Sequence, residues 1–224
     1  MTTALRICFI GDSFVQGVGD PQYRGWVGRV LAATGPAITA FNLGVRRDTS
    51  DDVLRRCWSE VEPRMLPGAD NRLVVSFGAN DAIEEDGAPR VSHARCLDNL
   101  ATVLGESRER GVAPLVVGPP PVVGAGAVHL RRALRLAEEM SVLCRAQGVP
   151  FVDVTAELAG DTVWVREASD GDGAHPGAGG YQRLADLVLA GSWHRWVADP
   201  HGRTPGRSAS SHREVIAGEP GSRP

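Results

Sequence analysis

Short apolar runs alternate with longer segments of helical pattern along most of the chain. The runs have the length of strands and are rich in Val, Ile and Leu: Leu5–Ile10, Ala37–Leu43, Leu73–Phe77, Pro114–Val117 and Pro150–Val154. Unbroken apolar runs are typical of strands that are covered on both faces. The segments between them predict helices over about Gly25–Ala33, Ser50–Glu60, Ser92–Arg110, Ala127–Gln147 and Gly177–Val197.

This alternation predicts βαβ units and a parallel sheet. Ser50, followed by Asp51 and Asp52, makes a good helix N-terminus, with acidic groups near the positive end of the helix dipole. Gly148 follows a predicted helix as a C-terminal stop. We therefore expect an α/β fold, a three-layer α/β/α sandwich with a five-stranded parallel sheet.

The last stretch of the chain has a different composition. From Asp199 to Pro224, Gly, Pro, Ser, Arg and His dominate and the apolar periodicity ends. Such segments cannot bury enough apolar surface to fold. We expect one domain over residues 1–198 and a flexible tail over residues 199–224.

Composition and charge exclude several classes of function. The chain has 224 residues, 24 basic and 27 acidic side chains and a net charge of −3. This balance argues against nucleic acid or an anionic membrane as the main partner. No signal-peptide pattern is seen, and no run approaches the roughly 18 apolar residues that span a bilayer. We expect a cytoplasmic protein that acts on a small molecule, with no stable membrane insertion.

The cysteines and most of the histidines give no sign of a metal site. Cys8, Cys57, Cys96 and Cys144 are scattered without the spacing of metal ligands, and we interpret them as buried or half-buried thiols. Three histidines are expected to be structural or solvated, namely His93, His129 and His194. Neither a metal nor a cofactor is expected.

Candidate chemistry begins where the first apolar run stops at Gly11-Asp12-Ser13. Gly11 permits a tight turn and close backbone approach. Ser13 then sits where a helix would begin, so that backbone N–H groups point at whatever it binds. A serine at such a place is often only a helix N-cap.

Three further polar blocks fall at the boundaries of predicted elements. They are Asn42-Leu43-Gly44, Gly78-Ala79-Asn80-Asp81 and Asp172-Gly173-Ala174-His175-Pro176. Each alone is ordinary turn or loop chemistry. Because ligands bind at the carboxyl ends of strands in open α/β sheets, we expect the four blocks to meet at one edge.

Together the blocks supply the groups that acyl transfer to water requires. The Ser13 hydroxyl is a poor nucleophile until a base takes its proton, and His175 is such a base. Asp172, three residues before His175, is placed to hold the ring tautomer and stabilise the imidazolium. The backbone N–H groups of Ser13 and Gly44 and the side-chain amide of Asn80 are candidate oxyanion donors.

At these residues the sequence resembles the SGNH hydrolases, also called the GDSL esterase/lipase superfamily. The four signature residues match Ser13, Gly44, Asn80 and His175, with Asp172 as the acidic partner. The resemblance runs from about Leu5 to about Leu189. It implies a flavodoxin-like fold and metal-free hydrolysis of esters or thioesters through an acyl-serine intermediate, and we assign Asp12 and Asp81 supporting roles.

The segment after Gly44 departs from the family pattern. Arg47 stands where the family often has a second glycine, which puts the shape of this loop in doubt. Arg46 and Arg47 either steer an anionic leaving group or are solvated loop cations. Pro120, within Pro119-Pro120-Pro121, either shapes the wall of an acyl pocket or belongs to a rigid turn.

The sequence leaves two other functions open. The same Ser-His-Asp site would serve an acyltransferase, or a deacetylase acting on a sugar or other alcohol. A non-catalytic flavodoxin-like binding module is the second alternative, although the Gly11–Gln16 stretch makes a poor flavin phosphate loop.

Overall fold

The computed structural model describes residues 4–35 and 37–199. A five-stranded parallel sheet runs through the centre in the order β2-β1-β3-β6-β7. The strands are β1 (Leu5–Gly11), β2 (Ile38–Gly44), β3 (Asp70–Ser76), β6 (Ala113–Val117) and β7 (Phe151–Val152). The predicted parallel sheet is confirmed, and its order is that of flavodoxin-like folds.

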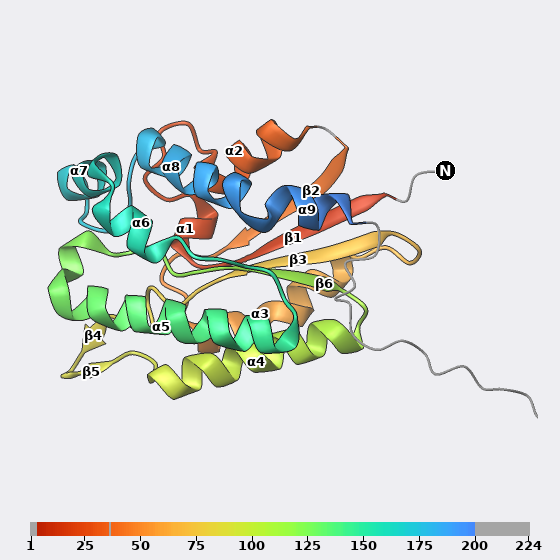
Figure 1. The fold of residues 1–224 in the computed structure, drawn as a ribbon, viewed down its shortest axis with the longest axis horizontal. Helices are drawn as coiled ribbons and strands as arrows, with labels where there is room; N and C mark the ends of the chain where they lie inside the picture. The colour runs from red at the N-terminus through yellow and green to blue at the C-terminus, as the bar shows by residue number, and fades with distance from the viewer. Residues whose placement is uncertain (1–3, 36, 200–224) are drawn as a thin grey trace, which may run out of the picture.

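Helices cover both faces of the sheet, which confirms the three layers (Figure 1). One face carries α3 (Ser50–Val61), α4 (His93–Glu109) and α5 (Gly126–Gln147). The other carries α1 (Ser13–Gln16), α2 (Gly25–Thr34), α7 (Thr162–Asp170), α8 (Ala178–Val188) and α9 (His194–Ala198), with α6 (Thr155–Gly160) beside them. Two 3₁₀ turns, Glu62–Arg64 and Val123–Ala125, complete the connections.

Each face of the sheet has its own apolar core. The face under α2 and α8 buries Trp26, Trp164 and Trp193. The opposite face is filled mainly by aliphatic side chains and by all four cysteines. All four cysteines are buried and free, as expected.

The structure corrects the sequence prediction near the chain's end. The sequence predicts one helix from Gly177 to Val197, but α8 ends at Val188 and a π-helical turn, Leu189–Trp193, precedes α9. Gly191 lies inside this turn with a non-helical ψ of −133°. Because glycine adopts such angles without steric cost, it interrupts a pattern that otherwise favours a single helix.

Three short helices and one hairpin are absent from the sequence prediction. They are α1, α6, α7 and the antiparallel pair β4 (Glu84–Glu85) and β5 (Ala88–Pro89). The last strand is also shorter than predicted, with only Phe151 and Val152 of the run from Pro150 to Val154 in the ladder. Elements this short carry too few periods of apolar spacing to be recognised.

The helix that follows β2 begins at Ser50, as the sequence predicts, but the residue before it supplies the cap. Thr49, not Ser50, is the N-cap of α3, and it forms a capping box with Asp52. The carboxylate of Asp52 accepts from the Thr49 N–H at 3.0 Å. The turn before α3 is therefore fixed from both sides.

Strand register brings the polar blocks together. Gly11 at the end of β1 pairs with Gly44 at the end of β2 and with Ser76 at the end of β3. The three strands therefore end side by side, and the blocks that follow them share one edge of the sheet.

The flexible tail expected over residues 199–224 lies, apart from Asp199, outside the described residues. Among helices in the described ranges, none has both the length and the apolar character of a membrane span.

Candidate active site

The turn between β1 and α1 presents Ser13. Asp12 is the N-cap of α1, and its Oδ1 accepts from the Phe14 N–H at 2.9 Å. Ser13 is the first residue of α1, so its own N–H has no helical carbonyl to bond to. Ser13 is therefore not the N-cap, because the neighbouring Asp12 caps the helix.

Ser13, His175 and Asp172 form a hydrogen-bonded relay. His175 Nε2 lies 2.7 Å from Ser13 Oγ, and His175 Nδ1 lies 2.7 Å from Asp172 Oδ2. The structure thus brings a hydroxyl and an imidazole 162 positions apart in the chain within bonding reach. These are the contacts that a nucleophile, its base and the orienting carboxylate make.

Asp172 is held by the loop that it starts. Its Oδ1 accepts from the backbone N–H groups of Ala174 at 3.0 Å and His175 at 2.9 Å, which explains how the three-residue spacing points both side chains the same way. Partial burial acts to raise the pKa of Asp172, but the hydrogen bonds from His175 and Ala174 outweigh it and lower the pKa to about 2. Asp172 is therefore an anion wherever the relay operates.

Aromatic packing restrains the His175 ring. The Phe14 ring lies 5.2 Å from it, centroid to centroid, and stacks in turn on Trp164. Only 8% of the His175 side chain is exposed. The imidazole is thus held in one place, with its reactive nitrogen directed at Ser13.

Gly44 allows β2 to approach α1 closely. A Cβ atom at Gly44 would lie 2.1 Å from the Gln16 backbone nitrogen, and one at Gly11 would lie 1.9 Å from the Ser76 carbonyl oxygen. No side chain fits at either position, so the two glycines let the blocks converge.

The structure corrects one expectation about the oxyanion donors. The sequence suggests that the Gly44 N–H is free, but it donates to Asn42 Oδ1 at 3.0 Å. The Asn42 amide in turn donates to the Val15 carbonyl at 2.7 Å. An oxyanion would therefore have to replace Asn42 as the acceptor of this N–H.

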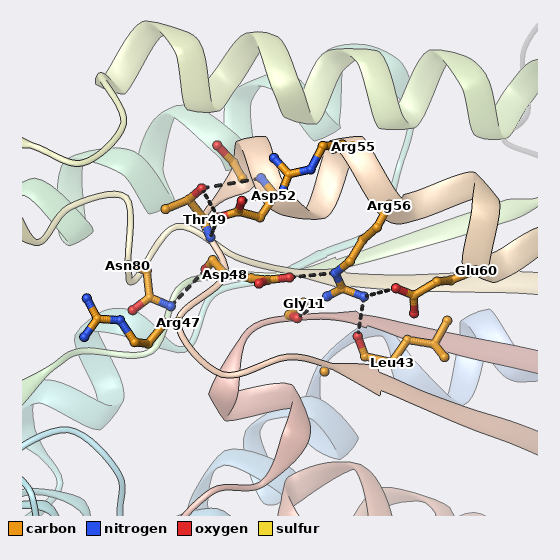
Figure 2. A network of polar contacts seen from close by, with 12 residues as sticks. Gly11, Leu43, Arg47, Asp48, Thr49, Asp52, Arg55, Arg56, Glu60 and Asn80 are labelled. Atoms are coloured by element: carbon orange, nitrogen blue, oxygen red, sulfur yellow. Dashed lines mark hydrogen bonds and ion pairs between the residues drawn. The ribbon is translucent and has the colours of Figure 1, made fainter.

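The Asn80 amide is fixed by the loop between β2 and α3. Its Nδ2 donates to the Asp48 carbonyl at 2.9 Å (Figure 2). A side-chain amide carries two N–H donors, so the second remains for a substrate.

The two residues expected to play supporting roles are both fully buried. Asp81 accepts from the Ser50 N–H and so joins the Asn80 turn to the start of α3. Burial raises the pKa of Asp12 to about 7, and the charges of Asp81 and Asp48 add to this effect. The second carboxylate oxygen of Asp12 has no partner among the described residues.

Both arginines of the loop after Gly44 are exposed and paired. Arg46 Nη2 lies 3.4 Å from Asp172 Oδ2, and Arg47 Nη2 lies 3.1 Å from Glu85 Oε1. Arg47 has a φ of +73°, so this loop keeps the left-handed backbone that a glycine would favour. These pairs favour the interpretation as loop cations, and steering of an anionic group stays a prediction.

The three prolines form a buried turn. The Pro119 carbonyl accepts from Thr155 Oγ1 at 2.8 Å, and the Pro121 carbonyl accepts from Trp164 Nε1 at 3.2 Å. Pro120 lies buried between them. These contacts favour the rigid-turn interpretation, and a contact of Pro120 with substrate stays a prediction.

Sequence reasoning missed two residues that brace the site. His129 was expected to be structural or solvated; it is buried, and its Nε2 lies 2.9 Å from the Ala79 carbonyl, next to Asn80. Arg56 reaches the ends of two strands and the side chain of Asp48 (Figure 2). One signal was present, since Arg56 lies three positions after Val53 and directly before Cys57, both of which are buried.

No group of three or more His, Cys, Asp or Glu side chains able to hold a metal ion occurs within residues 4–35 and 37–199.

Comparisons with known proteins agree with this geometry. A family model described as the GDSL-like Lipase/Acylhydrolase family matches residues 9–183. The chain superposes on a lipase/acylhydrolase from Enterococcus faecalis with a TM-score of 0.66 and 24% identity, covering 85% of this chain and 96% of that one. It also superposes on a catalytic mutant of the acetylxylan esterase Axe2 from Geobacillus stearothermophilus with a TM-score of 0.69 and 17% identity, covering 89% and 99%.

A curated relative is similar over part of its length. The uncharacterized lipoprotein YqeF of Bacillus subtilis (strain 168) is 32% identical over 112 residues, which are 49% of this chain and 44% of the relative. The match therefore spans less than half of that protein.

Proposed function

Because the chain belongs to the GDSL-like lipase/acylhydrolase family, we propose that it hydrolyses carboxylic esters or thioesters through an acyl-serine intermediate. The observation that carries the proposal is the relay, with 2.7 Å from Ser13 Oγ to His175 Nε2 and 2.7 Å from His175 Nδ1 to Asp172 Oδ2. Both distances are within the range required for proton transfer. Ser13, His175 and Asp172 are the proposed catalytic residues.

The reaction proceeds in two displacements. Ser13 Oγ attacks the carbonyl carbon while its proton passes to His175 Nε2, and the tetrahedral intermediate expels the alcohol or thiol, which takes that proton. Water then gives a proton to His175 and attacks the acyl-serine. The acid leaves, and the proton returns to Ser13. Asp172 remains ionised throughout and stabilises the imidazolium, in line with its low pKa.

Three N–H donors are proposed to stabilise the developing oxyanion. They are the backbone N–H groups of Ser13 and Gly44 and the second amide N–H of Asn80. All three lie at the carboxyl ends of neighbouring strands, since Ser13 follows β1, Gly44 ends β2 and Asn80 follows β3. Loss of one such donor typically costs about 3 kcal/mol of barrier.

Deacetylation of a sugar or other alcohol is the second candidate. It is supported by the likeness to an acetylxylan esterase whose solved structures include catalytic mutants of a serine, an aspartate and a histidine. At 17% identity this likeness concerns the fold alone, so the substrate stays open. Acyl transfer to an alcohol uses the same residues, and a product assay with competing alcohols separates it from hydrolysis.

Substitution of Ser13 by Ala tests the proposal. We expect Ser13→Ala to fold as the wild type does and to lose p-nitrophenyl acetate turnover and labelling by a fluorophosphonate probe, because no other hydroxyl occupies its place. Circular dichroism and thermal melting check the fold. Undiminished turnover by this variant would overturn the proposal. A wild-type protein that neither turns over the ester nor reacts with the probe would instead favour the flavodoxin-like binding module.

Steering by the loop cations has a separate test. If Arg47 attracts an anionic leaving group, Arg47→Ala lowers kcat/KM for an anionic ester more than for a neutral ester of equal size. Equal changes for both esters would exclude steering.

The cytoplasmic location also stays a prediction, since one relative is named a lipoprotein.

A further inference from the structure

Arg56 on α3 binds the carboxyl ends of two strands at once. Its Nη2 donates to the Gly11 carbonyl at the end of β1 at 2.7 Å, and its Nη1 donates to the Leu43 carbonyl of β2 at 2.9 Å (Figure 2). Both are hydrogen bonds from a cation, which are stronger than those from neutral donors. The guanidinium thus links the two strands that precede Ser13 and Gly44.

The contact with Leu43 acts on a proposed oxyanion donor directly. The Leu43 carbonyl and the Gly44 N–H belong to one peptide group, so a cation bound to the oxygen orients that plane. It also draws electron density toward the oxygen and makes the N–H a better donor, as in hydrogen-bonded chains that polarise one another.

The same guanidinium controls the loop that holds Asn80. Arg56 Nε donates to Asp48 Oδ2 at 2.6 Å, and the Asp48 carbonyl accepts from Asn80 Nδ2 at 2.9 Å. Asp48 is therefore fixed at its side chain by Arg56 and at its backbone by Asn80, as Figure 2 shows. The position of the Asn80 amide depends on this chain of contacts.

The Arg56 side chain is mostly buried among the groups that it contacts. Its side chain is 16% exposed, and Glu60 supplies a further oxygen at 3.2 Å from Nη1. The next residue in the chain offers a contrast, since Arg55 is 72% exposed and pairs only with Asp52 within its own helix among the described residues. Arg56 is thus enclosed by groups of the candidate site, whereas the adjacent Arg55 lies mostly in solvent.

We propose that Arg56 is a positioning residue of the oxyanion hole, which sets the Gly44 peptide and, through Asp48, the Asn80 amide. This inference rests on the proposed function. Arg56 touches no reacting atom, and it acts only through the donors that it holds.

The test compares substitutions at the two arginines. Arg56→Lys keeps the charge but loses the fork that reaches four acceptors, and Arg56→Ala loses both. We expect kcat for p-nitrophenyl acetate to fall about 10- to 100-fold with KM within threefold of wild type, because the donors act in the transition state. The matched variants Arg55→Lys and Arg55→Ala should keep the wild-type kcat.

A tetrahedral mimic separates positioning from general loosening of the fold. Phenylboronic acid forms an anionic adduct with the serine, so its Ki should rise by the same factor as kcat/KM falls. Added ethylguanidinium should restore part of the kcat of Arg56→Ala. Asp48→Asn, which weakens one contact of Arg56 without removing the arginine, supplies a second variant should the Arg56 variants fail to fold, and its kcat should fall about 10-fold.

The outcomes distinguish the two proposals. If Ser13→Ala loses activity but the Arg56 variants keep the wild-type kcat, the positioning role is overturned and the hydrolase proposal stands. If the Arg56 variants do not fold, a wild-type kcat in Asp48→Asn leads to the same conclusion. A kcat loss with an unchanged Ki for phenylboronic acid would overturn it as well. Full activity in Ser13→Ala would instead show that the proposed function had failed.

Discussion

Among single residues, Arg47 combines an exposed side chain with a backbone that suits glycine. Its φ is +73°, whereas the neighbouring Arg46 is not among the residues with positive φ. The left-handed conformation costs a residue with a Cβ atom about 1–2 kcal/mol of free energy. The loop after β2 therefore holds a non-glycine residue in this region at a cost in stability.

Replacing Arg47 by Gly should therefore stabilise the protein. The gain is about 0.5–1 kcal/mol, since relief of strain outweighs the exposed ion pair with Glu85 and the greater freedom of glycine in the unfolded chain. Thermal melting measures it as a rise of about 1–4 °C. The control is Arg46→Gly, which should lower the melting temperature. Equal destabilisation by both variants would contradict the explanation from backbone strain.

The side chains that meet in the candidate site could be predicted from the sequence, while their supports could not. Ser13, Asn80 and His175 were recognisable because each residue type is required by the chemistry and each lies at the boundary of a predicted element. Arg56 and Asp48 are joined by a contact across 8 positions, and Arg56 meets Gly11 across 45. Such contacts depend on strand register and helix rotation, which residue types alone do not reveal.

Among the elements, β2 and α1 pack closely because Gly44 of β2 has no side chain. Gly44 leaves no room for a Cβ against Val15 and Gln16 of α1, the helix that begins with Ser13. Tight packing of this kind transmits a displacement of one element to the other. The strand that ends in a proposed oxyanion donor therefore also sets the position of the nucleophile.

Substitution of Gly44 by Ala should destabilise the protein by about 2–4 kcal/mol, because the clash is with backbone atoms that cannot rotate away. Urea denaturation at pH 7 measures the change, and esterase turnover should fall with it. The matched control is Gly105→Ala on α4, where a Cβ meets nothing within 4 Å. That change should add about 0.5–1 kcal/mol of helix stability. Wild-type stability in Gly44→Ala would disprove the close approach.

Long elements were predictable for a simple physical reason. Strands buried on both faces have to be apolar throughout, and 10- to 22-residue helices repeat their apolar side several times. Helices of four to nine residues, such as α1, α6 and α7, owe their existence to caps and tertiary contacts. Gly191 interrupts the last predicted helix with a non-helical ψ of −133°, which glycine adopts without steric cost.

At the scale of the whole molecule, one buried carboxyl couples stability to pH. Asp12 is fully buried, and its pKa is raised from 3.8 to about 7. The folded state therefore binds more protons than the unfolded state between pH 4 and 7. This group contributes stability that is present at low pH and is lost as the pH rises through that window.

Asp12→Asn should therefore gain stability over the wild type as the pH increases. The difference in the free energy of unfolding should grow by about 2–4 kcal/mol from pH 4 to pH 8, since Asn keeps an acceptor for the Phe14 N–H and carries no charge. Denaturation across this pH range measures it. A difference that stays constant would show that Asp12 is ionised at low cost.

Asp172 provides the comparison of opposite sign. Its pKa is lowered to about 2, so it contributes stability that is present above pH 4 and is lost as the pH falls through 2. Asp172→Asn should accordingly be less stable than the wild type at neutral pH, and the two should converge in acid.

The order of the relay along the chain has a consequence for its synthesis. The ribosome adds Ser13 162 positions before His175. At about 5–20 residues per second, a nascent chain carries the hydroxyl for about 10–30 s with no imidazole beside it. Under the proposed mechanism, the growing polypeptide therefore acquires the base for Ser13 only when the loop before α8 has been synthesised.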